Sequence, residues 1–245
     1  MATTAVVLFF SVIQSLFGMG LLVFGTPTML LLGFDFDHTL ATLLPPSIVI
    51  SSLQLYKDRQ NIDRRMAINF ATFCLPFVVL TLSFYLYTKV KLKLEFGVAI
   101  FLLVSLLLRT APAFEKWMQQ LISSFQKPFL TIMGVVHGFT NMGGALLSVF
   151  ASSQYTSKEK VLNCVALCYL SFAVVQTIVL IIFAPHLFQP EAVLLSLAAG
   201  AIYLTLGRFL FTSTSQTFYK NLFSGFMFIY AALLILKGFG LMPHT

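Results

Sequence analysis

Long apolar segments dominate the chain, and short loops between them carry most of its charge. Eight such segments cover residues 5–33, 39–56, 66–88, 94–109, 128–153, 160–184, 191–211 and 221–237. A helix needs about 20 apolar residues to cross the hydrocarbon core of a bilayer. This pattern predicts an all-α polytopic membrane protein, with the lipid bilayer as a partner of most of its surface.

The composition supports the same class of protein. The chain is 58% hydrophobic and 9% charged, with a mean hydropathy of +0.93, whereas a soluble domain carries about 25% charged residues. The net charge of +7 is spread over the loops, so no nucleic-acid partner is expected. No phosphate-binding loop, dinucleotide fingerprint, nucleophile elbow or metal-ligand cluster occurs. We therefore expect no cofactor, no metal and no enzyme activity.

The first and fifth segments contain helix breakers near their middle. The stretch SLFGMGLLVFGTP (15–27) holds three glycines and a proline, and MGG occurs at 142–144. Backbone that leaves helical geometry at membrane depth must face protein or a water-filled cavity. Transporters place such discontinuous helices at a binding site near the bilayer midplane. We therefore predict a break in each of these two segments.

The two halves of the chain resemble each other. EFGVAIFLLVSLLLR (95–109) matches FSGFMFIYAALLILK (223–237) in its glycine and its basic end, and GMG (18–20) falls near MGG (142–144). These matches predict two repeats, residues 1–122 and 123–245. Each repeat would contain a re-entrant or broken helical hairpin (5–33 and 128–153) followed by three transmembrane helices.

The distribution of basic residues favours an inverted arrangement of the repeats. If all eight segments cross the membrane, the two faces carry eight and seven Lys and Arg residues. If the first and fifth segments are hairpins, the counts become eleven and four, as the positive-inside rule requires. The loops 57–65, 109–127, 157–160 and 208–220 are then cytoplasmic. Tilted, uninterrupted helices in the two segments are the alternative.

The breaks are suited to binding an anion. Backbone N–H groups at a helix N-terminus attract anions, and all eight acidic residues lie in loops or at segment ends. The predicted backbone contacts are Gly18, Gly20, Gly143 and Gly144, and the predicted side-chain donors are Thr42, His137, Asn141 and Asn163. Two alternatives remain open: the glycines serve close helix packing, and His137 is a neutral residue bonded to a neighbouring carbonyl.

The three cysteines are expected to be structural. Their number is odd and they lie in apolar runs, so a disulfide framework is not expected. Cys164 and Cys168 are four residues apart and therefore share one helix face. Because no histidine accompanies them, we interpret this pair as small buried hydrophobic residues.

Both halves resemble the sulfite exporter TauE/SafE family, also called the toluene sulfonate uptake permease family. The resemblance rests on FGMGLLVFGTPTMLLLGFDFDHTLATLL (17–44), on NMGGALLSVFASSQYTSKEKVLNCVAL (141–167) and on the basic loop YKDRQNIDRR (56–65). In this chain GMG stands where the family has a glycine triplet, and Asn163 stands where Thr or Ser is expected.

This resemblance implies a secondary transporter in the bacterial inner membrane. Its substrates would be small sulfur-containing anions such as sulfite, sulfonates or sulfoacetate, moved by alternating access. A coupling proton and a coupling sodium ion are both compatible with the sequence, and the oligomeric state is not indicated. An anion channel, and an accessory subunit or membrane-embedded enzyme without transport of its own, are the alternatives.

Overall fold

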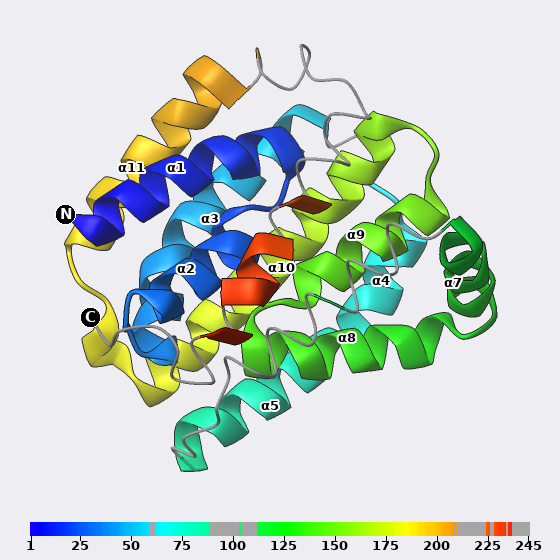
Figure 1. Ribbon diagram of the computed structural model, residues 1–245, viewed down its shortest axis with the longest axis horizontal. Helices are drawn as coiled ribbons and strands as arrows, with labels where there is room; N and C mark the ends of the chain where they lie inside the picture. Colours follow the sequence, from blue (N-terminus) through cyan, green and yellow to red (C-terminus); the bar gives the residue numbers. More distant parts are fainter. Residues whose placement is uncertain are drawn as a thin grey trace.

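The chain forms a helical bundle in the computed structural model (Figure 1). The structure describes residues 1–58, 62–88, 103, 112–207, 209, 224–225, 228–233 and 235–236, and no strand occurs among them. Segment 94–109, apart from residue 103, and part of segment 221–237 lie outside the described residues. The other six predicted segments are helical.

The first apolar segment folds back on itself. Helix α1 (Ala2–Phe17) ends at Gly18, which has a left-handed φ of 71° and donates its N–H to the Gln14 carbonyl at 2.8 Å. The chain continues as a π-helical turn, η1 (Leu21–Gly25), and as α2 (Thr26–Leu31). The rings of Phe10 and Phe24 lie 6.2 Å apart, whereas 14 residues of straight helix would separate them by about 21 Å.

The fifth segment has the same shape. Helix α8 (Gln126–Thr140) ends at Asn141, whose φ is 60° and whose N–H is donated to the His137 carbonyl at 2.8 Å. Helix α9 (Gly143–Gln154) then runs back along α8. The rings of Phe129 and Phe150 stack at 6.2 Å, where a straight helix would place them about 32 Å apart. The predicted breaks are therefore present in both segments.

Among the described residues, three helical stretches are long and apolar enough to cross a membrane. They are Phe36–Tyr56, Arg64–Thr88 and Glu159–Phe183, which belong to α3 (Phe36–Asp58), to α4 (Arg64–Phe73) with α5 (Leu75–Thr88), and to α10 (Lys158–Phe183). After a short 3-10 turn, η3 (Pro185–Leu187), helix α11 (Glu191–Ile202) continues into the π-helical turn η4 (Tyr203–Gly207). The boundaries of segments 39–56, 66–88 and 160–184, and the start of segment 191–211, agree with these helices to within a few residues.

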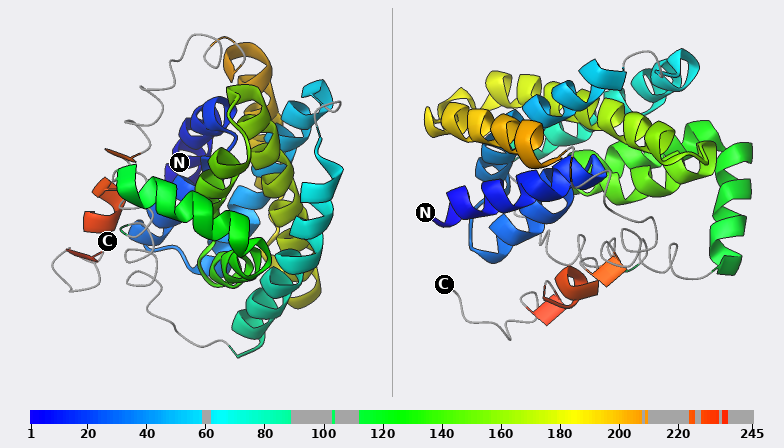
Figure 2. Two further views of the ribbon diagram at one scale, coloured as in Figure 1. Left: turned by 90° about the vertical axis from the view of Figure 1, so that its right-hand side faces the viewer. Right: turned by 90° about the horizontal axis from the view of Figure 1, so that it is seen from above.

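One predicted loop is a helix. We expected residues 109–127 to be a charged connection, but Pro112–Ser124 form α7. Proline at the first position of a helix is favourable, because its missing N–H would have no partner there. The helix packs against α8 and α9 at the edge of the bundle, where Figures 1 and 2 show it crossing the ends of both.

Close contact between α5 and α8 depends on two glycines spaced four apart. A Cβ on Gly134 would fall on the Cys74 carbonyl, and a Cβ on Gly138 would fall on the Thr81 hydroxyl. Membrane helices use small residues in this spacing to let backbones approach. These glycines fix α8, and with it the second break, against α5.

The outer surface is apolar where lipid would cover it. Large hydrophobic side chains are exposed on α5, α10 and α11, among them Leu80, Phe84, Ile182, Leu194 and Leu197. The interior, in contrast, holds buried polar residues near both helix breaks. This inversion of the usual pattern agrees with a membrane location and directs attention to the breaks.

Candidate functional site

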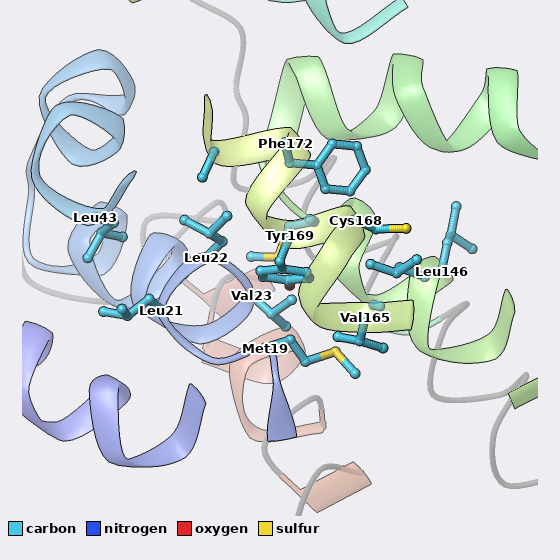
Figure 3. Close-up of a cluster of buried hydrophobic side chains, with 14 of the residues drawn as sticks. Met19, Leu21, Leu22, Val23, Leu43, Leu146, Val165, Cys168, Tyr169 and Phe172 are labelled. Carbon is cyan, nitrogen blue, oxygen red and sulfur yellow. The ribbon is translucent and has the colours of Figure 1, made fainter. Parts of the chain in front are cut away.

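The first break is closely packed. A Cβ on Gly18 would lie 2.8 Å from Cδ1 of Leu162 and 3.1 Å from Cγ1 of Val165, both on α10. A Cβ on Gly20 would lie 2.5 Å from the Gln14 nitrogen. Figure 3 shows Met19, Leu22 and Val23 of this break beside Val165 and Tyr169 of α10. In this conformation, close packing explains both glycines; their contact with an anion stays a prediction.

Gln14 satisfies the polar groups of the first break internally. Its Nε2 donates to the Ser47 carbonyl (3.2 Å) and lies near the hydroxyls of Ser47 (3.0 Å) and Ser51 (3.2 Å), while its Oε1 accepts from the Leu21 N–H at 3.2 Å. Gln54 adds a bond from its Nε2 to the Gln14 carbonyl at 3.2 Å. The side chain of Gln14 therefore has no hydrogen-bonding group left over for a ligand.

His137 lies at the corresponding place before the second break, four residues ahead of the left-handed residue. Its Nε2 lies 3.1 Å from Oε1 of Gln176, and its ring stacks on Phe172 with centroids 3.6 Å apart. The side chain is fully buried. Its Nδ1 has no partner and faces Gly143, because a Cβ there would lie 2.9 Å from this atom. A carbonyl partner for His137, one of the two alternatives, is thus present on the Gln176 side chain, and binding of an anion by His137 stays a prediction.

Asn141 joins the second break to the first hairpin. Its Nδ2 donates to Oγ1 of Thr26 at 2.8 Å, and its Oδ1 has no partner although the residue is fully buried. Gln176 is also fully buried, and its Nε2 has no partner. Three buried side chains around the second break, those of His137, Asn141 and Gln176, thus keep unused hydrogen-bonding groups.

The start of α9 contributes backbone groups to the same place. Gly143 and Gly144 are its first two residues, and no side chain caps this end. Their N–H groups have no acceptor in their own helix, since the first amides of any helix lack one. A Cβ on Gly144 would collide with Tyr169 and Val23. The N-terminus of α9, the positive end of the helix dipole, is therefore buried next to the unused side-chain groups.

The other two predicted donors lie elsewhere in the structure. Thr42 is half-buried on α3 and donates its hydroxyl proton to the His38 carbonyl of its own helix at 2.9 Å. Asn163 is buried on α10, next in sequence to Leu162, which contacts Gly18. The structure thus brings His137, Asn141, Gly143 and Gly144 together.

Gln176 was missed by the sequence analysis. It is a single amide in the apolar run AVVQTIVL (173–180), and polar residues inside membrane segments are rare and tend to be functional. That signal could have identified it. Its proximity to His137, 39 residues earlier, could not be read from the sequence.

Among the residues that the structure describes, no group of three His, Cys, Asp or Glu side chains could hold a metal. The fold and the site are those of a polytopic helical membrane protein with two folded-back helices and a buried polar break, and discontinuous helices of this kind occur in transporters. The chain belongs to the sulfite exporter TauE/SafE family, whose family model matches residues 3–234. This is a family of membrane transporters, so the chain is a transporter and not an enzyme, and the resemblance in its motifs is confirmed. No match was found among curated proteins or among solved structures.

Proposed function

We propose that the chain carries a small sulfur-containing oxyanion, such as sulfite, a sulfonate or sulfoacetate, and binds it at the second helix break. The observation that supports this most directly is the set of unused polar groups on His137, Asn141 and Gln176, all fully buried beside the N-terminus of α9. Buried polar groups are rarely left unpaired unless a ligand or water uses them.

The chemistry of these groups fits an oxyanion. The unpaired Nε2 of Gln176 and the N–H groups of Gly143 and Gly144 donate hydrogen bonds without adding negative charge. Asn141 can donate only through its Nδ2, which also bonds to Thr26, because its unpaired Oδ1 is an acceptor. A proton on Nδ1 of His137 would add a charged donor, and hydrogen bonds to charged groups are the stronger ones. The proposed substrate would therefore travel with a proton held by His137, in preference to a sodium ion.

The present conformation is closed around the site. His137 and Asn141 have no exposed surface, so the substrate reaches them only after a rearrangement. The bond between Asn141 and Thr26 joins the two hairpins. We propose that alternating access separates the hairpins at this bond, with residues 1–122 and 123–245 acting as inverted repeats and Gly18, Gly20, Thr42 and Asn163 lining the path of the anion.

Flux of radiolabelled sulfite into or out of proteoliposomes that contain the purified chain tests the site. Asn141→Gly keeps the left-handed backbone but removes the amide, and Gln176→Leu removes the other amide at similar volume. Each should reduce flux about tenfold or more, because one hydrogen bond to a charged ligand contributes about 1.5–3 kcal/mol. Ser196→Ala is the matched control, since this buried hydroxyl on α11 bonds only to its own helix at Ala192.

If both site variants transport sulfite at the wild-type rate, the second break is not the binding site. Absence of flux from the wild-type chain, with the protein correctly folded, would instead favour an accessory role. Currents far above the turnover of a carrier would favour a channel. Each result points to a different one of the alternatives raised by the sequence.

A further inference from the structure

Three sulfur atoms meet inside the bundle, one helical turn along α10 from Phe172, the residue that stacks on His137. Sγ of Cys164 and Sγ of Cys168 each lie 4.0 Å from Sδ of Met66. The two cysteines come from one face of α10, and the methionine comes from the first turn of α4. All three side chains are buried, and both cysteines are free thiols.

The two distances between the cysteine and methionine sulfurs fit a metal with three sulfur ligands. Metal–sulfur bonds to small cations are about 2.3 Å long, so three sulfurs around one trigonal ion lie about 4.0 Å from one another. Thiolate and thioether ligands together select Cu(I) over harder cations. We propose that Cys164, Cys168 and Met66 form a binding site for a soft monovalent metal ion, Cu(I).

Two of the three sulfurs lie near the loop end of their helices. Met66 is three residues after Asp63, which caps α4 by accepting from the N–H groups of Arg65 and Met66. The exposed carboxylate of Asp63 also accepts a hydrogen bond of 2.8 Å from the Tyr155 hydroxyl. Cys164 lies less than two helical turns from Ser157, the N-cap of α10. Met66 and Cys164 thus lie just beneath the loops at one end of the bundle.

The chemistry of binding balances in protons and charge. Each thiol must lose its proton to bind the metal as thiolate, so the uptake of one Cu(I) ion by Cys164 and Cys168 releases two protons. The thioether of Met66 binds without a proton change. No oxidation or reduction is involved, and apparent affinity should therefore rise with pH.

Titration of the purified, reduced chain in detergent with Cu(I), in competition with bicinchoninate under anaerobic conditions, tests this proposal. We expect one Cu(I) per chain, and X-ray absorption should show a shell of sulfur neighbours at about 2.3 Å. Cys164→Ser and Cys168→Ser should each lower the affinity about 100-fold, and Met66→Leu about tenfold, the range in which metal sites respond to altered surroundings.

Two control variants separate this site from general thiol binding. Cys74→Ser removes a buried free cysteine at the C-terminal end of α4, away from the proposed site. Met29→Leu removes a buried methionine in α2. Both should keep the wild-type affinity. If the cysteine variants fail to fold, Met66→Leu still decides the matter, because Met and Leu have similar volumes. Wild-type affinity in Met66→Leu, a nitrogen or oxygen shell, or equal loss in Cys74→Ser would overturn the proposal.

Discussion

Gln14 and His137 occupy corresponding places four residues before a left-handed helix end, yet their surroundings differ. Gln14 uses its amide within the protein, whereas His137 keeps Nδ1 without a partner beside Gly143. The same backbone shape therefore presents a satisfied polar group in one hairpin and an unsatisfied one in the other. This difference at single residues is the reason to assign the substrate to the second break.

Replacing His137 by the residue of the first hairpin tests its role. His137→Gln retains a side chain that can bond to Gln176 but cannot accept a proton. We expect the variant to fold and to bind substrate, and its transport rate should depend less on pH, because glutamine has no proton to gain or lose. Flux measured as a function of pH is the readout, and an unchanged pH profile would contradict proton coupling through His137.

Asp63 gives a second prediction, for stability. The hydrogen bond from the Met66 amide, and then that from the Tyr155 hydroxyl, lower the pKa of Asp63 in the folded protein. A lowered pKa stabilises the fold above the unfolded value of about 4 and loses this contribution as pH falls through the folded value. Asp63→Asn should therefore lower Tm at pH 7 and have a smaller effect as pH falls below about 4.

Thermal unfolding in detergent at pH 7 and pH 3 measures this difference. The Tyr155→Phe variant is the matched control, because it removes one partner of the carboxylate and leaves the helix cap intact. It should show a smaller loss of stability with the same pH trend. An equal effect of Asp63→Asn at pH 7 and pH 3 would contradict the assignment.

At the scale of helices, the glycine spacing on α8 determines how closely α5 approaches. Gly134→Ala should destabilise the protein by about 1–3 kcal/mol, as expected for overpacking a tight contact, because its Cβ meets the backbone carbonyl of Cys74. Gly225→Ala is the control. No described atom lies within 4 Å of a Cβ there, and alanine favours a helix over glycine. Equal unfolding temperatures for the two variants would contradict this account.

The helices themselves could be predicted from the sequence to a large extent. Apolar length predicted the long helices α3 and α10, and the glycines of GMG and MGG predicted the two breaks. The prediction of a loop at α7 was wrong, because its charged residues suggested a connection between segments and the favourable position of Pro112 was not considered. The pairings of His137 with Gln176 and of Met66 with two cysteines could not be predicted, since they depend on how distant helices pack.

The whole molecule should show a specific orientation in the membrane. If both hairpins are re-entrant, residues 4 and 34 lie on the same side of the bilayer, and so do residues 125 and 156. Reporter fusions at these four positions measure this directly. We expect equal signals within each pair, because the chain returns along α1 and along α8. Opposite signals within a pair would favour a tilted full crossing and would remove the inverted arrangement of residues 1–122 and 123–245.

If the two halves of the chain are repeats, the left-handed residue at each break also bears on how they diverged. The bend needs only a residue that tolerates positive φ, which glycine does most readily and asparagine more than other residues. The first half meets this need with Gly18, which adds no side chain. The second half meets it with Asn141, whose side chain also donates a hydrogen bond to Thr26. After a duplication, a single exchange between these two residue types could thus preserve the shape while giving one copy a new chemical group. Specialisation of the copies would then require no change in the fold.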